Sequence, residues 1–184
     1  SLGSFSMLVV DPVSEKPVFS DQVNKARTPA SVIKLLTAAA ALSALGPDTR
    51  IATRATLAGS DLYLVGGGDP LLRKTKGENS LKALALDTIS ALKTRKVTNI
   101  RLFFDDSLFT GPALGPGWKS SFPKAGIAGP VSALSVGGGR VSPGSVARVS
   151  NPAKQAGRLF AKRLKKAGIG VSQVRRGQAP SRSS

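Results

Sequence analysis

The chain of 184 residues contains no cysteine and no histidine. Without cysteine it can form no disulfide, and the sequence carries no sign of its redox compartment. Without histidine it can build neither a Ser-His-Asp triad nor a histidine-ligated metal site. No other cluster of metal-ligating residues is visible, so we expect no metal and no cofactor. The lack of histidine also favours lysine as the base in any mechanism that uses a serine nucleophile.

Acidic residues are scarce, and they are missing from the last part of the chain. Residues 1–106 hold 14 basic and 10 acidic groups, whereas residues 107–184 hold 13 basic groups and no acid. The net charge of the whole chain is +17. A block of one sign attracts partners of the opposite sign. One hypothesis is therefore a basic module that binds nucleic acid or another polyanion without catalysis. Anionic cell-surface polymers are a second class of partner.

Aromatic side chains make up only 5% of the chain. Single-stranded nucleic acids are commonly held on aromatic rings, so this scarcity argues against a specific nucleic-acid partner, and no recognised nucleic-acid motif is present. A solvated helix face explains much of the charge, because four basic residues fall on one amphipathic helix: Lys162, Arg163, Lys165 and Lys166. We expect no specific nucleic acid among the partners.

The chain contains one long apolar run, Val32–Leu45, which is rich in alanine. Thr28 is placed to cap the start of a helix, and Pro29 suits the first helical position. Gly46, followed by a proline, marks the end of the helix. A helix that is apolar on nearly every side is usually buried, so the pattern predicts a buried helix.

The few polar residues of this helix, Ser31, Lys34 and Thr37, recur at every third position and form one narrow stripe. Lys34 also interrupts the apolar run, which is too short to cross a bilayer, so we expect no membrane span. Burial of an unpaired ammonium is costly, and a neutral lysine can take the proton of a serine hydroxyl. Ser31 lies in the first turn, where free N–H groups favour negative charge. The pair is a candidate nucleophile and base.

The Ser-x-x-Lys spacing alone is weak, because the chain contains it three times. Ser90–Lys93 falls late in an amphipathic segment, where both residues should face water. Ser121–Lys124 contains a proline that disfavours a helix at the residue before it. Only the first copy combines a helix N-terminus with an apolar setting. Helix position alone still favours the simpler interpretation of a first-turn serine and a lysine that extends to solvent.

A resemblance changes that balance. The stretch Arg27–Gly46, RTPASVIKLLTAAAALSALG, closely resembles the active-site helix of the penicillin-binding-protein-4-like D-alanyl-D-alanine carboxypeptidases of peptidase family S13. Further segments resemble the same family in the same order: Met7–Pro12, Leu64–Leu71, Phe104–Phe109 with Gly117–Trp118, Pro130–Ser135 and Asn151–Lys154. They extend over almost the whole chain and are far more specific than the four-residue pattern.

The resemblance implies a serine-type peptidase, a hydrolase that acts on peptidoglycan in the cell wall. Ser31 would attack the carbonyl of a stem peptide that ends in D-Ala-D-Ala and form an acyl-enzyme, Lys34 would accept the hydroxyl proton, and β-lactams would acylate the same serine. Carboxypeptidase and endopeptidase action both stay open. The resemblance further implies a place outside the cytoplasm, in the cell envelope or secreted, with a signal peptide that is not part of this chain.

The chain also departs from the family pattern. Family members carry a Ser-x-Asn motif and a Lys-Thr-Gly-type strand further along, and neither occurs here. We therefore expect the N-terminal part of a longer enzyme, with doubtful activity on its own, because catalytic groups that act as a unit lose most of their rate when members are missing. A fragment that binds β-lactams or supports the envelope without turnover is a third hypothesis.

The expected fold is mixed α/β. By resemblance, residues 1–55 form part of a penicillin-binding transpeptidase-like domain with a strand pair and the buried helix, residues 56–178 form an inserted α+β domain, and residues 179–184 form a polar tail. Hydrophobic patterns and turn residues predict strands at 5–11, 17–20, 51–57, 61–65, 100–104, 131–136 and 171–174, and further helices at 81–96 and 151–168. Residues 110–129, rich in glycine and proline, are predicted to be loop.

Overall fold

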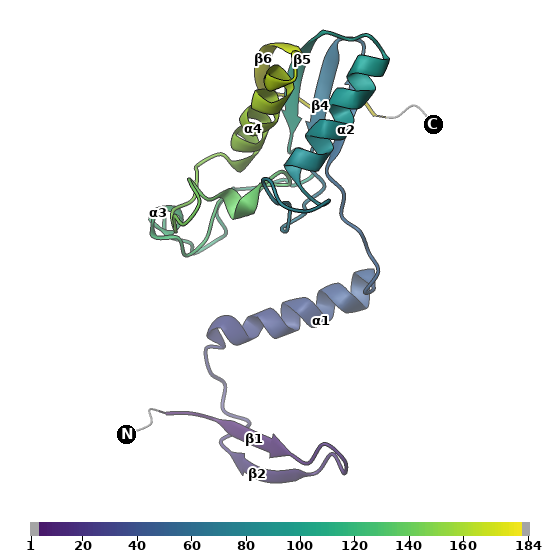
Figure 1. Ribbon diagram of the computed structural model, residues 1–184. Helices are drawn as coiled ribbons and strands as arrows, with labels where there is room; N and C mark the ends of the chain where they lie inside the picture. Colours follow the sequence, from purple (N-terminus) through teal and green to yellow (C-terminus); the bar gives the residue numbers. More distant parts are fainter. Residues whose placement is uncertain (1–3, 182–184) are drawn as a thin grey trace. The chain divides into compact units, whose positions relative to one another are not determined.

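The computed structural model of the chain describes residues 4–181. Residues 1–3 of the predicted first domain and residues 182–184 of the predicted tail lie outside it. The chain divides into two compact units, Ser1–Thr49 (unit 1) and Arg50–Ser184 (unit 2), whose elements are shown in Figure 1. The predicted domain limits refer to the domains of the family and stay a prediction.

Unit 1 begins with the predicted strand pair. β1 (Met7–Val10) runs antiparallel to β2 (Pro17–Asp21). Asp11 holds the turn between them, because its carboxylate accepts hydrogen bonds from the Val13 N–H and the Ser14 hydroxyl. These hydrogen bonds favour the charged form and hold the pKa of Asp11 below its ordinary value.

The predicted helix follows in two parts, a turn of 3-10 helix, η1 (Ala30–Val32), and the α-helix α1 (Ile33–Leu45). Gly46 ends the helix as predicted, with a φ of 76° that glycine adopts without strain. The predicted cap is wrong. Because η1 separates Thr28 from the α-helix, the residue at the cap position of α1 is Val32, which has no polar side chain.

Unit 1 leaves its apolar side chains exposed. Leu35 and Leu36 are 70% and 67% exposed, and α1 has no buried residue. The expectation of a buried helix is therefore wrong for α1 as it stands here. A pair of short strands is too small to cover a helix that is apolar on every side. Across residues 4–181, no helix has both the length and the apolar character needed to cross a membrane.

Unit 2 is built on a four-stranded sheet in the order β3-β4-β5-β6. β3 (Arg54–Ala58) and β4 (Asp61–Val65) form an antiparallel hairpin. β5 (Asn99–Asp105) runs parallel to β4, and β6 (Gly170–Arg176) runs parallel to β5. The sequence predicts all four strands to within a few residues.

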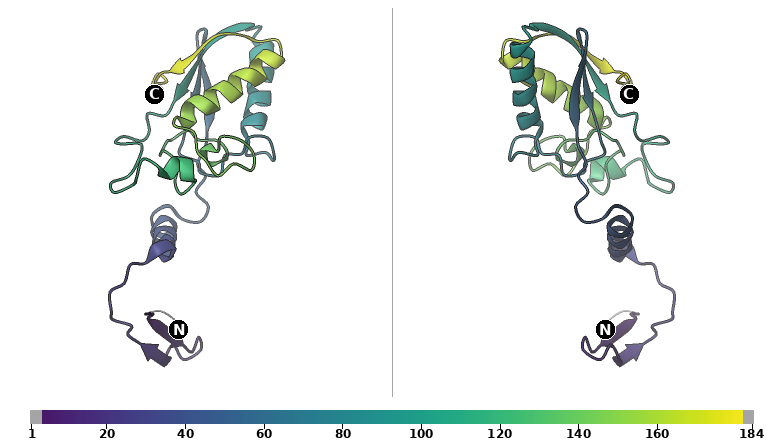
Figure 2. Two further views of the ribbon diagram at one scale, coloured as in Figure 1. Left: turned by 90° about the vertical axis from the view of Figure 1, so that its left-hand side faces the viewer. Right: turned by 90° about the vertical axis from the view of Figure 1, so that its right-hand side faces the viewer.

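Two predicted helices connect the parallel strands. α2 (Leu81–Thr94) lies between β4 and β5, and α4 (Pro152–Lys166) lies between β5 and β6. The side chains of Ser80 and Asn151 cap them by accepting hydrogen bonds from the N–H of the third residue of each helix. Both crossovers step across the sheet in the same direction, and crossovers between parallel strands are right-handed, so both helices must cover the same face. Figure 2 shows them on one side of the sheet.

The core of unit 2 lies between the sheet and these helices. Along β4, Leu62 and Leu64 are buried while their neighbours are partly exposed, as the period-two alternation of a strand requires. From α4, Phe160 and Leu164 are completely buried. Burial of each such side chain contributes about 1.5–3 kcal/mol to folding.

The prediction of a strand at 131–136 is wrong. The backbone of this segment is hydrogen-bonded to loops instead of to a neighbouring strand. The Val131 N–H donates to the Ala113 carbonyl, and the Ala133 carbonyl accepts from the Gly68 N–H. The segment still buries apolar residues, Ala133, Leu134 and Val136, which is why its sequence resembles a strand.

The prediction of continuous loop at 110–129 is also wrong, because this stretch contains a short helix, α3 (Phe122–Ala125). Pro123 was expected to prevent a helix between Ser121 and Lys124. It lies in the first turn, where its missing N–H interrupts no helical hydrogen bond.

The end of β5 is tied to the chain beyond β6 through Asp105, which is 5% exposed. Its carboxylate accepts hydrogen bonds from the N–H groups of Ser107 and Ala179. Burial raises the pKa of Asp105, but these hydrogen bonds and the charge of Arg176 outweigh that effect and hold the pKa below its ordinary value. The folded state therefore favours the carboxylate.

Replacement of Asp105 by asparagine should destabilise unit 2 in a pH-dependent way. A carboxyl group whose pKa is lower in the folded state adds stability above its unfolded pKa of about 3.9 and loses it as the pH falls through the folded pKa. We expect Asp105→Asn to lower the free energy of unfolding by about 1–3 kcal/mol near neutral pH. The difference should shrink steadily in stronger acid. Urea unfolding followed by circular dichroism measures it, with the exposed Asp87→Asn as control. A loss that does not change with pH would contradict the assignment.

The two units should also differ in local stability. Amides in residues 33–45 should exchange with solvent much faster than those in residues 99–105, because the central strand opens only when the core of unit 2 unfolds. Hydrogen exchange of the whole chain, measured by mass spectrometry, compares the two segments directly. Equal protection would show that other surface covers α1.

Candidate active site

Ser31 and Lys34 come together at the start of α1. The Lys34 ammonium donates a hydrogen bond from Nζ to Ser31 Oγ, with 2.9 Å between the two atoms. Ser31 lies in η1 and Lys34 in the first turn of α1, and residues three apart along a helix are neighbours on one face. The helical backbone at the junction of η1 and α1 thus brings the two predicted groups together.

Both side chains are exposed in this structure, and the lysine is the donor. A lysine that acts as a base must first lose its proton, and desolvation is what favours the neutral amine. The apolar residues around Lys34, such as Leu35, would provide that desolvation once another apolar surface covers α1. Ser31 Oγ and Lys34 Nζ are close enough for proton transfer. Whether the pair is buried depends on what covers the helix.

The backbone that carries the serine is unusual. Ala30, directly before Ser31, has a φ of 44°, in the left-handed region that alanine rarely adopts. Such backbone conformations cost about 1–3 kcal/mol and are concentrated at functional sites. The first N–H groups of a helix also lack partners within it, and Ser31 belongs to this first turn. Its own N–H is a candidate donor to an oxyanion formed on attack.

Arg27, four residues before the serine, makes contacts that sequence reasoning missed. Its guanidinium donates hydrogen bonds to the hydroxyls of Ser4 and Ser6, the carbonyl of Phe5 and the side-chain oxygen of Gln22. These contacts join the chain that enters η1 to the ends of the strand pair. No local pattern could have revealed them, because most partners lie more than 20 positions away in the sequence.

The other two Ser-x-x-Lys copies are not brought together in this way. Ser90 and Lys93 are exposed on α2, as predicted. Ser121 lies just before α3, with Lys124 inside it. In the part of the chain that the structure describes, only the first copy has its serine and lysine joined by a hydrogen bond. Thr37 does not join that pair, since its hydroxyl donates to a carbonyl of its own helix.

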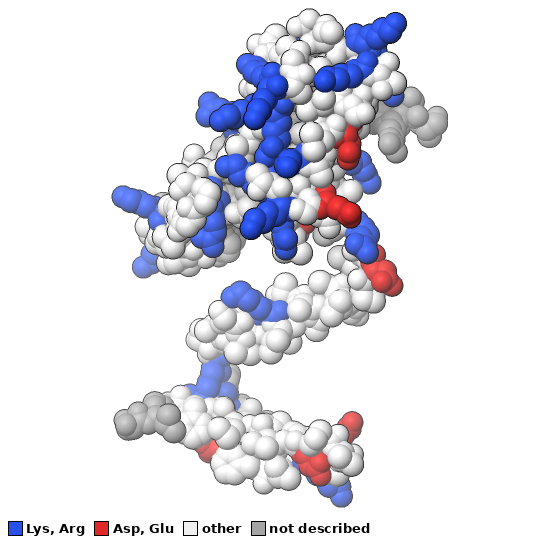
Figure 3. Space-filling model, viewed as in Figure 1, with Lys and Arg blue, Asp and Glu red and all other residues white. Residues whose placement is uncertain are grey.

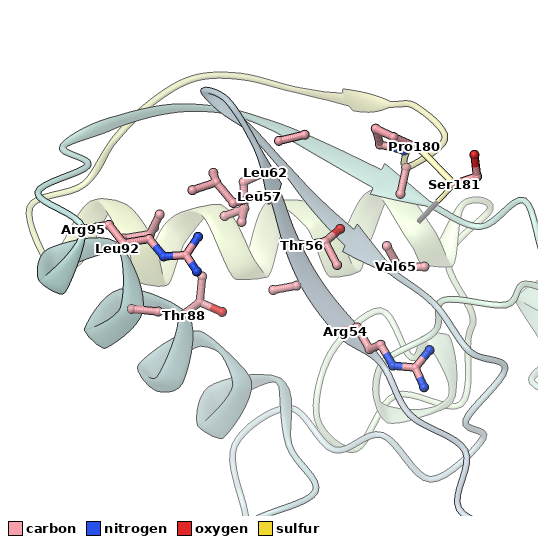
Figure 4. Close-up of a pocket in the computed structure, with 14 residues that line it drawn as sticks. Arg54, Thr56, Leu57, Leu62, Val65, Thr88, Leu92, Arg95, Pro180 and Ser181 are labelled. Carbon is pink, nitrogen blue, oxygen red and sulfur yellow. The ribbon is translucent and has the colours of Figure 1, made fainter. Parts of the chain in front are cut away.

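A separate groove of about 840 Å³ lies beside β3 in unit 2. Figure 4 shows Arg54 and Arg95 at opposite ends of it, with leucines between them. The Thr88 hydroxyl, which also lines the groove, donates to a carbonyl of its own helix. Among the described lining residues, no nucleophile is hydrogen-bonded to a base. Between residues 4 and 181 there is also no group of three or more His, Cys, Asp or Glu that could hold a metal ion.

Comparisons with known proteins identify the family of the chain. Residues 2–147 match the family model described as the D-Ala-D-Ala carboxypeptidase 3 (S13) family. Carboxypeptidase Rv3627c of Mycobacterium tuberculosis is 32% identical over 173 residues, which are 89% of this chain and 38% of that protein. Carboxypeptidase DacB of Mycolicibacterium smegmatis is 34% identical over 145 residues, 74% of this chain and 32% of that protein. The D-alanyl-D-alanine carboxypeptidase of an Actinomadura species is 32% identical over 78% of this chain and 27% of its own length.

Among solved structures, penicillin-binding protein 4 (dacB) from Haemophilus influenzae matches with a TM-score of 0.63 at 17% identity, over 92% of this chain and 52% of that one. This likeness confirms the predicted mixed α/β, penicillin-binding-protein-like fold. The chain spans about a third of the length of the curated relatives it matches. The family model covers most of the chain, and the curated relatives exceed 30% identity. The chain therefore belongs to the D-Ala-D-Ala carboxypeptidase 3 (S13) family.

Proposed function

We propose that this chain carries the nucleophile-bearing part of a serine-type D-Ala-D-Ala carboxypeptidase, a hydrolase that acts on peptidoglycan stem peptides through an acyl-enzyme. The observation that carries the proposal is the 2.9 Å hydrogen bond between Lys34 Nζ and Ser31 Oγ in the first turn of an apolar helix. Family membership supports this peptidase over a basic nucleic-acid-binding module. The chain spans 38% of its mycobacterial relative. The proposed roles of Ser31 and Lys34 therefore apply to the whole enzyme of which this chain is a part.

The proposed reaction proceeds in two steps. Ser31 Oγ attacks the carbonyl carbon between the two D-alanines, and its proton passes to the neutral Lys34 amine. The peptide C–N bond then breaks, and the amine of the departing D-alanine takes the proton that Lys34 accepted. Water finally hydrolyses the acyl ester and restores the serine. The N–H of Ser31 is suited to stabilise the oxyanion during attack.

The proposal requires that α1 be covered in the whole enzyme. Its exposed leucines support this requirement, because Leu35, Leu36 and Leu42 are each more than half exposed here. Burial of each contributes about 1.5–3 kcal/mol, so another apolar surface would bind the helix favourably. The same burial would desolvate Lys34 and favour its neutral form.

We also propose that β-lactams acylate Ser31, since they present a reactive carbonyl to the same nucleophile. The cell-wall substrate places the protein outside the cytoplasm, in the envelope or secreted. Both statements follow from the proposed chemistry and from the family, and the first can be tested by penicillin labelling.

A labelled penicillin should modify Ser31 in the whole enzyme. Ser31→Ala should reduce the acylation rate by about 10³-fold or more, as loss of a nucleophile does in serine hydrolases. Ser90→Ala is the matched control, because it removes the serine of another Ser-x-x-Lys copy and should leave labelling unchanged. Mass mapping of the adduct decides the site. An adduct on Ser90 or Ser121 would refute the assignment.

Lys34→Arg should also prevent acylation, because a guanidinium cannot give up its proton near neutral pH. Loss of a general base typically costs about 10²–10⁴-fold in rate. The matched control is Lys93→Arg, which makes the same exchange in the exposed copy on α2. Stopped-flow acylation of the whole enzyme measures both variants. If Lys34→Arg retains the original rate, the role of Lys34 is structural only.

A further inference from the structure

The net charge of +17 lies entirely in unit 2. Residues 1–49 hold four basic and four acidic groups, whereas residues 50–184 hold 23 basic and six acidic groups. Within unit 2, two of those acids are already engaged in ion pairs, Asp61 with Arg101 and Asp106 with Arg176. The remaining acids are far too few to neutralise the basic side chains. This unit therefore presents a strong positive field that the proposed peptidase chemistry does not use.

The charge is densest on α4, which has six basic residues and no acidic residue. Lys154, Arg158, Lys162 and Lys166 follow one another at four-residue intervals, so they lie along one side of the helix for about 18 Å. We refer to these four residues as the α4 stripe. All four are exposed, because the opposite side of α4 packs into the core. Figure 3 shows basic side chains gathered over the part of unit 2 where α2 and α4 lie.

The α4 stripe opposes the stability of its own helix. Like charges four residues apart repel, and α4 has no acidic residue to offset the repulsion. Lys154 also lies in the first turn, where the helix dipole disfavours a positive charge. A bound chain of negative charges would relieve both effects, because each anion would face a cation.

A neighbouring loop widens the basic surface. Arg163 donates a hydrogen bond of 3.2 Å to the carbonyl of Lys74, which holds the loop of Arg73, Lys74 and Lys76 beside α4. These three side chains are exposed. The loop comes from a distant part of the sequence, so the fold itself brings a second set of cations to the stripe.

We propose that the α4 stripe binds a linear phosphate-diester polymer that carries no nucleobases. A row of exposed cations along a helix fits a polymer, whereas a small anion needs a pocket. Nucleic acids held as single strands require aromatic stacking, and the one aromatic residue of α4, Phe160, is completely buried. Binding to a membrane surface requires apolar residues beside the charges, and the outward side of α4 carries none.

The test is the binding of an abasic oligonucleotide, which keeps the phosphate diesters and lacks the bases. Fluorescence anisotropy gives the affinity of the whole chain over a range of salt concentrations. Replacement of all four stripe residues by glutamine should reduce the slope of log K against log salt by about 3, since each lost phosphate contact removes about 0.7. A mixed-sequence oligonucleotide of equal length should bind with the same affinity as the abasic one.

The matched control removes the same charge elsewhere, through Lys16→Gln, Lys25→Gln, Lys119→Gln and Lys124→Gln, all at exposed positions outside α4. It should change the slope far less than the stripe variant. An equal change in both variants would overturn the proposal, because net charge alone would then explain binding. Binding of the mixed-sequence oligonucleotide more than about tenfold tighter would overturn it in favour of a nucleic-acid site.

A charge-preserving variant separates the effect of lost charge from the effect of lost folding. Lys154→Arg, Lys162→Arg and Lys166→Arg together keep the stripe positive and keep long side chains at exposed positions. This variant should retain the affinity and the salt slope of the unsubstituted chain. Loss of binding in this variant would overturn the proposal, since it would show that charge along the stripe is not what the ligand contacts.

Discussion

The handedness of the crossovers between parallel strands is the constraint on which unit 2 depends. Because crossovers between parallel strands are right-handed as a rule and both step in the same direction, α2 and α4 lie on one face of the sheet. This arrangement gathers the apolar side chains of four strands and two helices into one core. It also fixes which side of α4 faces water, and that side is free to collect charge without disturbing the packing. The fold thus separates the source of stability from the surface that carries the charge.

Unit 1 follows a different principle. Its strand pair and helix are local structures, and their apolar surfaces are not buried against one another to form a core. The candidate catalytic pair is nevertheless present, because a contact between Ser31 and Lys34 needs only three residues of helical backbone. The local helical geometry therefore brings Ser31 and Lys34 into contact. The apolar surroundings that would make the serine reactive must come from a surface outside unit 1.

The elements that the sequence predicts well are those whose signals are local. Asn151, with a proline after it, predicts the start of α4, and alternating apolar residues predict β4. The Ser31–Lys34 pair is predictable for the same reason, since both residues lie within one turn. The resemblance of the surrounding segments then favours the first of the three copies as the catalytic one.

The features that the sequence does not predict depend on distant partners. Residues 131–136 are apolar enough for a strand, but nothing in their pattern shows that their N–H and C=O groups bond to loops. The role of Arg27 is invisible for a similar reason, because its partners belong to the far ends of the strand pair. The exposure of α1 likewise depends on what lies outside the helix. Its apolar sequence indicates that the helix needs to be buried, but not which surface buries it.

The 3-10 turn before α1 has a consequence for control of the serine. In a 3-10 helix, residues three apart point in the same direction, whereas in an α-helix they differ by about 60° around the axis. Rewinding η1 as α-helix would therefore change the angle between the two side chains and still leave Ser31 and Lys34 as neighbours on one face of the helix. The left-handed φ of Ala30 and the 3-10 turn that it opens therefore set the direction from which the serine hydroxyl meets the lysine amine, and with it the side of the helix from which a substrate carbonyl must approach.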